Sequence, residues 1–210
     1  MYDDVIALRV FYRSLLGQHL ARQMQPHIAR FWQSDSSSCN VMLGYGVGWL
    51  PPKYSVAKAP ENLLSLMLAR SGVVAWPASG ACRSSLVAGH ELPLPDVHVD
   101  RLLLAHALEF DPQPEYLLDE CWRVLDGAGK VLVAVPNRRG LWAQREHTPF
   151  GHGRPYSSRQ LCQLLENHGF LPQQVYRVAF LPPFHNSVLM RFAHGVERLG
   201  QRWWPALGGV

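Results

Sequence analysis

Two groups of residues carry side chains that can hold or transfer a proton, and the first follows an apolar run. His106 and Glu109 come directly after Val99–Ala105, a run that suits a strand buried on both faces. Residues just past a parallel strand lie at the carboxyl edge of the sheet, where open α/β sheets bind ligands. We therefore expect His106 and Glu109 to meet a ligand there, or else to form a wall of its site or a helix cap.

The second group follows a later apolar run and contains His147, His152, Arg154 and Tyr156. A loop of this composition can close over a substrate and supply a base or a clamp for an anion. The alternative is a structured lid without chemistry. No metal site is expected, because the two histidines are separated by proline and glycine, lack helical spacing and have no third ligand nearby.

A glycine-rich turn is the third feature with chemical meaning. The short apolar run 40–43 ends in Gly44-Tyr45-Gly46-Val47-Gly48, and glycine lets the backbone approach a ligand closely. The pattern alone has low specificity, and a tight turn without a ligand is the alternative.

The elements that must position these residues alternate along the chain. Ser157 and Ser158 cap one expected helix, and the helix at the N-terminus is expected to break at Pro26. Alternating strands and helices require a mainly parallel sheet covered on both faces. The expected strands span 40–43, 62–68, 84–87, 99–105, 130–136 and 173–180, and the expected helices span 5–32, 114–125, 157–169 and 187–199.

Composition fits one ordinary globular domain. The chain has 210 residues, of which 48% are hydrophobic and 17% charged, with a net charge of +4 that is not gathered into one run. Nucleic-acid binding is therefore not indicated. The four cysteines lack the close pairing of a zinc or redox site, and we expect reduced thiols. No apolar run approaches the ~20 residues that cross a bilayer, so the predicted location is the cytoplasm.

Several segments, in order, resemble class I S-adenosylmethionine-dependent methyltransferases of the type 11 group. Residues 41–48 look like the nucleotide-binding motif, and Leu92-Pro93-Leu94-Pro95-Asp96 before residues 99–104 resembles the family's loop and fourth strand. Residues 117–125 resemble the helix that precedes its fifth strand, and 136–142 with 147–157 are similar to an uncharacterised bacterial branch. The resemblance covers about residues 40–170 and implies S-adenosylmethionine as the cofactor.

The chain departs from this family at acidic positions. Relatives usually carry an acid two residues before the first glycine, where Met42 stands, and another at the end of the second strand, near Met67. The latter acid usually receives the ribose hydroxyls. Glu91 is the one candidate for a third acid, near the adenine. These replacements predict weakened or rearranged cofactor binding.

The resemblance yields a full set of expectations. The fold is α/β, a Rossmann-like class I methyltransferase three-layer sandwich with a mainly parallel sheet that lacks the usual seventh strand. One domain spans 1–210, with an N-terminal helical cap at 1–33, a core at 39–180 and a C-terminal helical extension at 181–210. The expected cofactor-binding residues are Gly44, Tyr45, Gly46, Gly48, Glu91, Leu92, Ala105 and His106. The candidate catalytic residues are His106, His147, His152 and Tyr156.

The expected function is methyl transfer to a small-molecule acceptor that the sequence does not identify. One alternative is a catalytically inactive relative that acts as an interaction or regulatory protein. A second is methylation of a lipid or quinone at a membrane surface, suggested by the basic amphipathic N-terminal helix and by Trp203 and Trp204. Without the seventh strand, an unpaired sheet edge would favour a homodimer.

Overall fold

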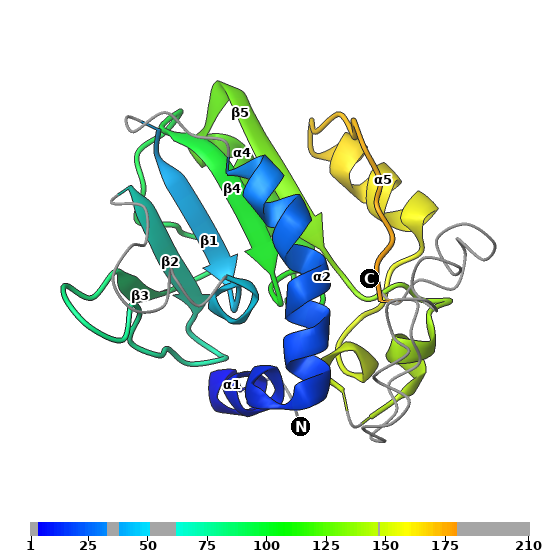
Figure 1. Cartoon of the computed structure of the whole chain (residues 1–210). Coiled ribbons are helices and arrows are strands. Elements are labelled where there is room, and N and C mark those ends of the chain that lie inside the picture. The colour runs from blue at the N-terminus through cyan, green and yellow to red at the C-terminus, as the bar shows by residue number, and fades with distance from the viewer. Residues whose placement is uncertain (1–3, 33–37, 51–61, 147, 180–210) are drawn as a thin grey trace.

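A computed structural model describes residues 4–32, 38–50, 62–146 and 148–179 of the chain, and a five-stranded parallel sheet lies at its centre (Figure 1). The strands are β1 Asn40–Gly44, β2 Leu63–Leu68, β3 Ser84–Val87, β4 Val99–Ala105 and β5 Leu125–Ala134. Their order across the sheet is β3-β2-β1-β4-β5, and every neighbouring pair is parallel. The direction of strand addition therefore reverses between β1 and β4, as the α/β interpretation predicts.

Helices cover both faces of this sheet and make three layers. Helix α2 (Leu15–Phe31) lies over one face and α4 (Pro114–Val124) over the other, while α1 (Val5–Arg13) lies at the carboxyl ends of the strands (Figure 1). The side chains of β1 alternate accordingly, so that Met42 joins the apolar cluster of α1 and α2 whereas Val41 and Leu43 join the cluster of α4. The Rossmann-like three-layer fold is thus confirmed.

The break in the N-terminal helix lies at Ser14 and not at Pro26, so that prediction is wrong. Ser14 has an extended backbone, and its hydroxyl accepts the amide N–H of Gly17 at 3.1 Å, which caps the start of α2. A Cβ at Gly17 would lie 2.1 Å from the carbonyl oxygen of Phe11, so the tight junction requires glycine. Pro26 stays within α2.

The second half of the chain differs from expectation at two places. Helix α4 passes directly into β5, which begins at Leu125 and contains Gly127 and Gly129. The sequence had predicted that these glycines end the helix and that the strand begins only at residue 130. Residues 173–179 contain no strand, so the sixth strand predicted at 173–180 is wrong over its described part. The helix predicted at 187–199 and the extension at 181–210 lie outside the described residues.

Other boundaries agree closely with the sequence patterns. Helix α5 (Ser158–Asn167) begins with a reciprocal cap between Ser157 and Gln160, and it lies beside the β5 end of the sheet (Figure 1). In the described part of the chain, β3 and β5 are the two outer strands. A dimer through such an edge stays a prediction.

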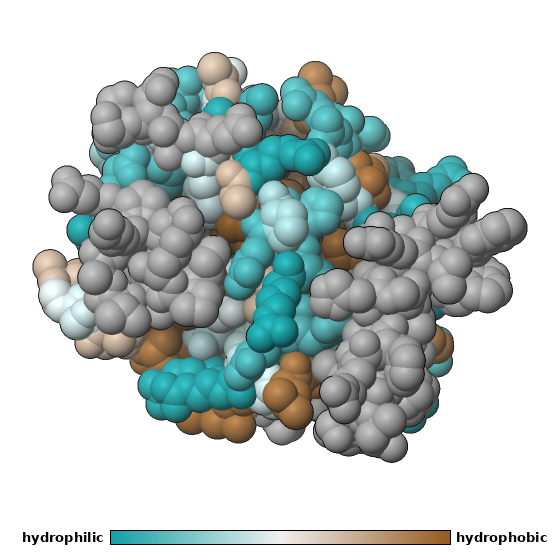
Figure 2. Space-filling model, in the orientation of Figure 1, coloured by the Kyte–Doolittle hydropathy of each residue, from teal (hydrophilic) through white to brown (hydrophobic). Residues whose placement is uncertain are grey.

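The surface above α2 is mainly polar. Hydrophilic side chains form a band along the outward face of this helix (Figure 2). Across the residues that the structure describes, none of the helices combines the length and the apolar character that a membrane span requires.

Candidate functional site

The glycine turn lies where the strand order reverses. Gly44 ends β1 and pairs in register with Ala105 at the end of β4. Its φ is +85°, and a Cβ there would stand 2.2 Å from the carbonyl oxygen of Ala105. Only glycine fits this close crossing of two strand ends. The turn thus lies at the carboxyl edge of the sheet, at the topological switch point where such folds bind ligands.

The other two glycines of the turn contact side chains. A Cβ at Gly46 would meet the sulfur of Met42 at 3.2 Å and the Cβ of Ala105 at 3.4 Å. At Gly48 it would meet the ring of Tyr12 at 2.8 Å. Gly48 therefore makes room for a tyrosine from α1, and the turn continues as one 3-10 turn, η1 (Val47–Trp49).

Tyr12, His106 and Glu109 form a buried chain of hydrogen bonds beside this turn. The Tyr12 hydroxyl lies 2.6 Å from Nε2 of His106, and Nδ1 of His106 lies 3.1 Å from Oε1 of Glu109. With the hydroxyl donating to Nε2, the proton of the imidazole is on Nδ1 and is donated to the carboxylate. Burial raises the pKa of Tyr12 well above its ordinary value, so this tyrosine stays a neutral donor.

Aromatic rings enclose His106. Its ring centroid lies 5.1 Å from that of Phe150, 5.3 Å from that of Trp49 and 5.7 Å from that of Tyr12. Phe150 comes from the short turn η3 (Pro149–Gly151), in the loop that the sequence predicted to close over the site. His106 also has a φ of +52°, a conformation that costs free energy in residues other than glycine and concentrates at functional sites.

The remaining catalytic candidates have different surroundings. His152 donates from Nε2 to the carbonyl oxygen of Glu146 at 2.6 Å, within its own loop. Tyr156 is buried in the apolar cluster of α4, where burial raises its pKa, and its backbone bonds to Pro136 and Arg138. His147 lies outside the described residues.

The expected cofactor-binding residues divide into two groups. Tyr45, Ala105 and His106 lie with the three glycines at the tips of β1 and β4 and are buried. Leu92 belongs to the cluster on the opposite face, and its amide N–H donates to the Glu120 carboxylate at 2.8 Å. Glu91 is exposed and forms an isolated bridge with Ala88.

The two positions that lack the expected acid are part of the core. Met42 and Met67 are buried in the cluster of α1 and α2, and the sulfur of Met67 accepts the amide N–H of Val74 at 3.4 Å. A carboxylate at either position would be desolvated by these helices. The replacement of acid by methionine therefore matches the packing of the N-terminal helices.

A small pocket of about 220 Å³ lies at the carboxyl ends of β2 and β3, the edge shared with the glycine turn. Its lining includes Arg70 after β2, His90 after β3, and Asp111 with Gln113 from the loop before α4. Asp111 is the one carboxylate among the described residues that line it. A pocket of this size with few polar groups suits part of a nucleoside.

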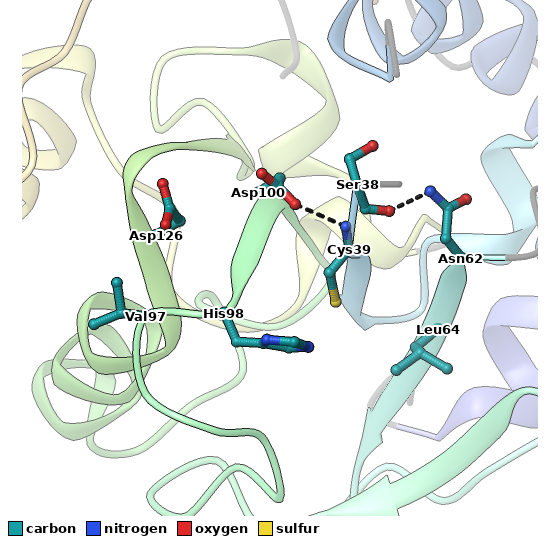
Figure 3. A pocket seen from close by; sticks show the side chains of 8 residues that line it. All are labelled: Ser38, Cys39, Asn62, Leu64, Val97, His98, Asp100 and Asp126. Atoms are coloured by element: carbon teal, nitrogen blue, oxygen red, sulfur yellow. Dashed lines mark hydrogen bonds between the residues drawn. The ribbon is translucent and has the colours of Figure 1, made fainter. Parts of the chain in front are cut away.

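A larger and more open pocket, of about 490 Å³, lies at the opposite edge of the sheet. It is lined by residues at the amino ends of the strands, including Cys39, Asn62 and Asp100, and the Asp100 carboxylate accepts the Cys39 amide N–H at 2.8 Å (Figure 3). Open parallel sheets bind ligands at the carboxyl edge, so the smaller pocket is the better candidate.

Sequence reasoning missed Tyr12. The apolar pattern of the N-terminal helix identified its buried neighbours Leu8 and Phe11 as core positions, and Tyr12 lies beside them with its ring also buried. The signal that was available is a tyrosine on the apolar face of a helix, because a buried hydroxyl requires a hydrogen-bond partner.

Comparison with known proteins agrees with this geometry. A family model described as "Methyltransferase domain" matches residues 57–133. Over these residues the chain is similar to that family. A relative in Mycobacterium tuberculosis, named "Probable S-adenosylmethionine-dependent methyltransferase", is 36% identical over 124 residues, which cover 57% of this chain and 43% of that protein. The chain spans less than half the length of the curated relatives that it matches.

Solved structures share the fold of this methyltransferase-like chain. A methyltransferase from Archaeoglobus fulgidus, named as dependent on S-adenosylmethionine, has a TM-score of 0.56 at 18% identity and covers 94% of this chain and 91% of its own. The [4+2]-cyclase SpnF has a TM-score of 0.58 at 19% identity, and the match covers 93% of this chain and 74% of the cyclase. Such distant likeness establishes the class I methyltransferase fold, and the cyclase shows that reactions differ on it.

Proposed function

We propose that this chain binds S-adenosylmethionine at the carboxyl edge of its sheet and transfers the methyl group to a small-molecule acceptor. The observation that carries the proposal is the position of the Gly44–Gly48 turn, which follows the central strand β1 beside the tip of β4. The family match and the names of the mycobacterial relatives support the same activity. They lend no support to a non-catalytic role.

The residues at this edge fit such a ligand in two parts. The pocket beside Arg70, His90 and Asp111 suits the nucleoside, with Asp111 able to accept ribose hydroxyl protons in place of the acid missing near Met67. The Gly44–Gly48 turn suits the methionine end. When bound, the cofactor would supply an electrophilic methyl group on a sulfonium, so alignment of the acceptor and exclusion of water are the main tasks of the protein.

Entry of the methionine end requires α1 to move. The Tyr12 ring fills the space above Gly48, and Tyr45 stacks on Tyr12 with their ring centroids 6.0 Å apart. Helix α1 is joined to α2 at the extended residue Ser14, and its first amide donates to the carbonyl oxygen of Ser71 at 2.8 Å. A hinge at Ser14 would let the helix withdraw Tyr12 while α2 stays on the sheet.

Calorimetric titration with S-adenosylmethionine and S-adenosylhomocysteine tests the proposal. We expect saturable heat with the wild-type chain and at least a tenfold loss of affinity in Gly46→Arg, because an arginine would fill the turn. Gly127→Arg is the matched control, since a Cβ at Gly127 has no atom within 4 Å. Absence of binding at millimolar concentrations of either compound would reject the proposal.

A further inference from the structure

The Tyr12–His106–Glu109 chain contains one unsatisfied atom. Oε2 of Glu109 is buried and has no hydrogen-bond partner among the residues that the structure describes. His106 and Glu109 are each 2% exposed. Burying a carboxylate with one oxygen unbonded costs free energy, which is offset when the carboxylate stabilises a positive charge beside it. The imidazole of His106, bonded to the carboxylate through Nδ1–H, acquires such a charge when it accepts a proton.

We propose that the His106–Glu109 pair is the general base of the site and that the methyl acceptor carries a hydroxyl group, which takes the place of the Tyr12 hydroxyl on Nε2. This inference rests on the proposed function and names its substrate class. Tyr12 shows that the site accepts an aromatic hydroxyl, because its hydroxyl lies 2.6 Å from Nε2 and its ring contacts the rings of Tyr45 and Trp49.

The chemistry of acceptors favours a hydroxyl over an amine or a thiol. A neutral amine attacks through its lone pair, and a thiol with a pKa of about 8.5 is partly ionised near neutrality, whereas a phenol with a pKa of about 10 keeps its proton. A base oriented by a carboxylate therefore accelerates transfer to a hydroxyl most. An amine or thiol acceptor would leave the buried pair without a role.

The proton and the methyl group move in one balanced step. His106 Nε2 accepts the hydroxyl proton as the acceptor oxygen forms its bond to the methyl carbon. The bond between that carbon and sulfur breaks, and sulfur keeps the electron pair and becomes a neutral thioether. Glu109 acts as a positioning residue, because it holds Nδ1–H and stabilises the imidazolium that forms on His106.

The probe for this inference is 4-nitrophenol, whose phenolate is yellow and whose neutral form is colourless. It is titrated into the wild-type chain saturated with S-adenosylhomocysteine, at a pH where most of the free phenol is protonated. We expect saturable binding with the phenolate spectrum. The ether 4-nitroanisole has no proton to give, and we expect it to bind at least tenfold more weakly.

Variants separate the base from its surroundings. His106→Gln should remove the phenolate spectrum, and Glu109→Gln should weaken it. His168→Gln is the matched control, because His168 also pairs through Nδ1 with a carboxylate, that of Asp119 at 2.6 Å, but on the surface.

The outcomes distinguish the two proposals. If S-adenosylhomocysteine binds while the phenol does not, binds without ionising, or binds no better than its ether, the inference is overturned and the proposed function stands. The same holds if His106→Gln behaves like His168→Gln. The comparison of phenol and ether in the wild-type chain decides the question even if His106→Gln does not fold. Failure of S-adenosylhomocysteine itself to bind overturns both.

Discussion

The hydroxyl of Tyr12 and Nε2 of His106 lie 2.6 Å apart in the protein interior although 94 positions separate them in the sequence. This bond joins the first helix to the tip of β4, so it reports whether α1 is closed over the glycine turn. It is also the contact that a substrate hydroxyl would replace.

Tyr12→Phe removes this bond and leaves Nε2 of His106 buried without a donor. We expect the free energy of unfolding to fall by about 1–3 kcal/mol, measured by urea denaturation. Tyr116→Phe is the control, because Tyr116 lies on α4 with 57% of its surface exposed and should change stability little. Equal stability of the two variants would contradict a formed Tyr12–His106 bond.

Gly48→Ala tests whether Tyr12 occupies the glycine turn. The new methyl group would meet the Tyr12 ring at 2.8 Å, and overpacking of this kind costs about 1–3 kcal/mol. In a Tyr12→Ala background the same substitution should cost clearly less, giving a coupling of at least about 0.5 kcal/mol in a double-mutant cycle. Gly127→Ala, with open space around it, is the control. Additive effects at positions 12 and 48 would show that the ring lies elsewhere.

The sequence predicted the sheet better than it predicted the site. Apolar runs located β1, β2 and β4 closely because strands buried on both faces leave a local signal. The start of β5 was missed because glycines usually mark the end of a helix or strand. Here Gly127 and Gly129 lie inside β5, where its pairing with β4 shifts register between Val99 and Arg101.

Contacts between residues far apart in the sequence were not predicted from it. His106 and Glu109 were found because they follow β4, but Tyr12 reaches them only through the packing of α1. The break at Ser14 was also missed, since its cause is a side-chain cap and a glycine contact whereas Pro26 gives a stronger local signal. Tertiary contacts decided both cases.

Glu120→Gln tests the link that holds the Leu92 turn. Hydrogen bonding to Arg123 lowers the pKa of Glu120, whose carboxylate also accepts the Leu92 amide N–H. A lowered folded-state pKa adds stability above the unfolded-state pKa and loses it as the pH falls. The variant should therefore be less stable by about 1 kcal/mol at pH 7, with the difference shrinking below about pH 4.5. Glu115→Gln, which replaces an exposed glutamate on the same helix, is the control for the substitution itself.

Alkaline titration tests how tightly α1 closes the glycine turn. Burial raises the pKa of Tyr45 to about 12 and raises that of Tyr12 as well, from an ordinary value near 10. A folded-state pKa above the unfolded one gives stability that is complete below pH 10 and is lost as the pH rises through the folded value. We expect the tyrosinate absorbance of Tyr12 and Tyr45 to appear only together with loss of the near-ultraviolet circular dichroism signal. In Tyr45→Phe the midpoint of alkaline unfolding should move to higher pH, because one buried hydroxyl that loses its proton on unfolding is gone. Ionisation of Tyr45 at pH 10 in the folded protein would instead show that the space above Gly48 is open to solvent.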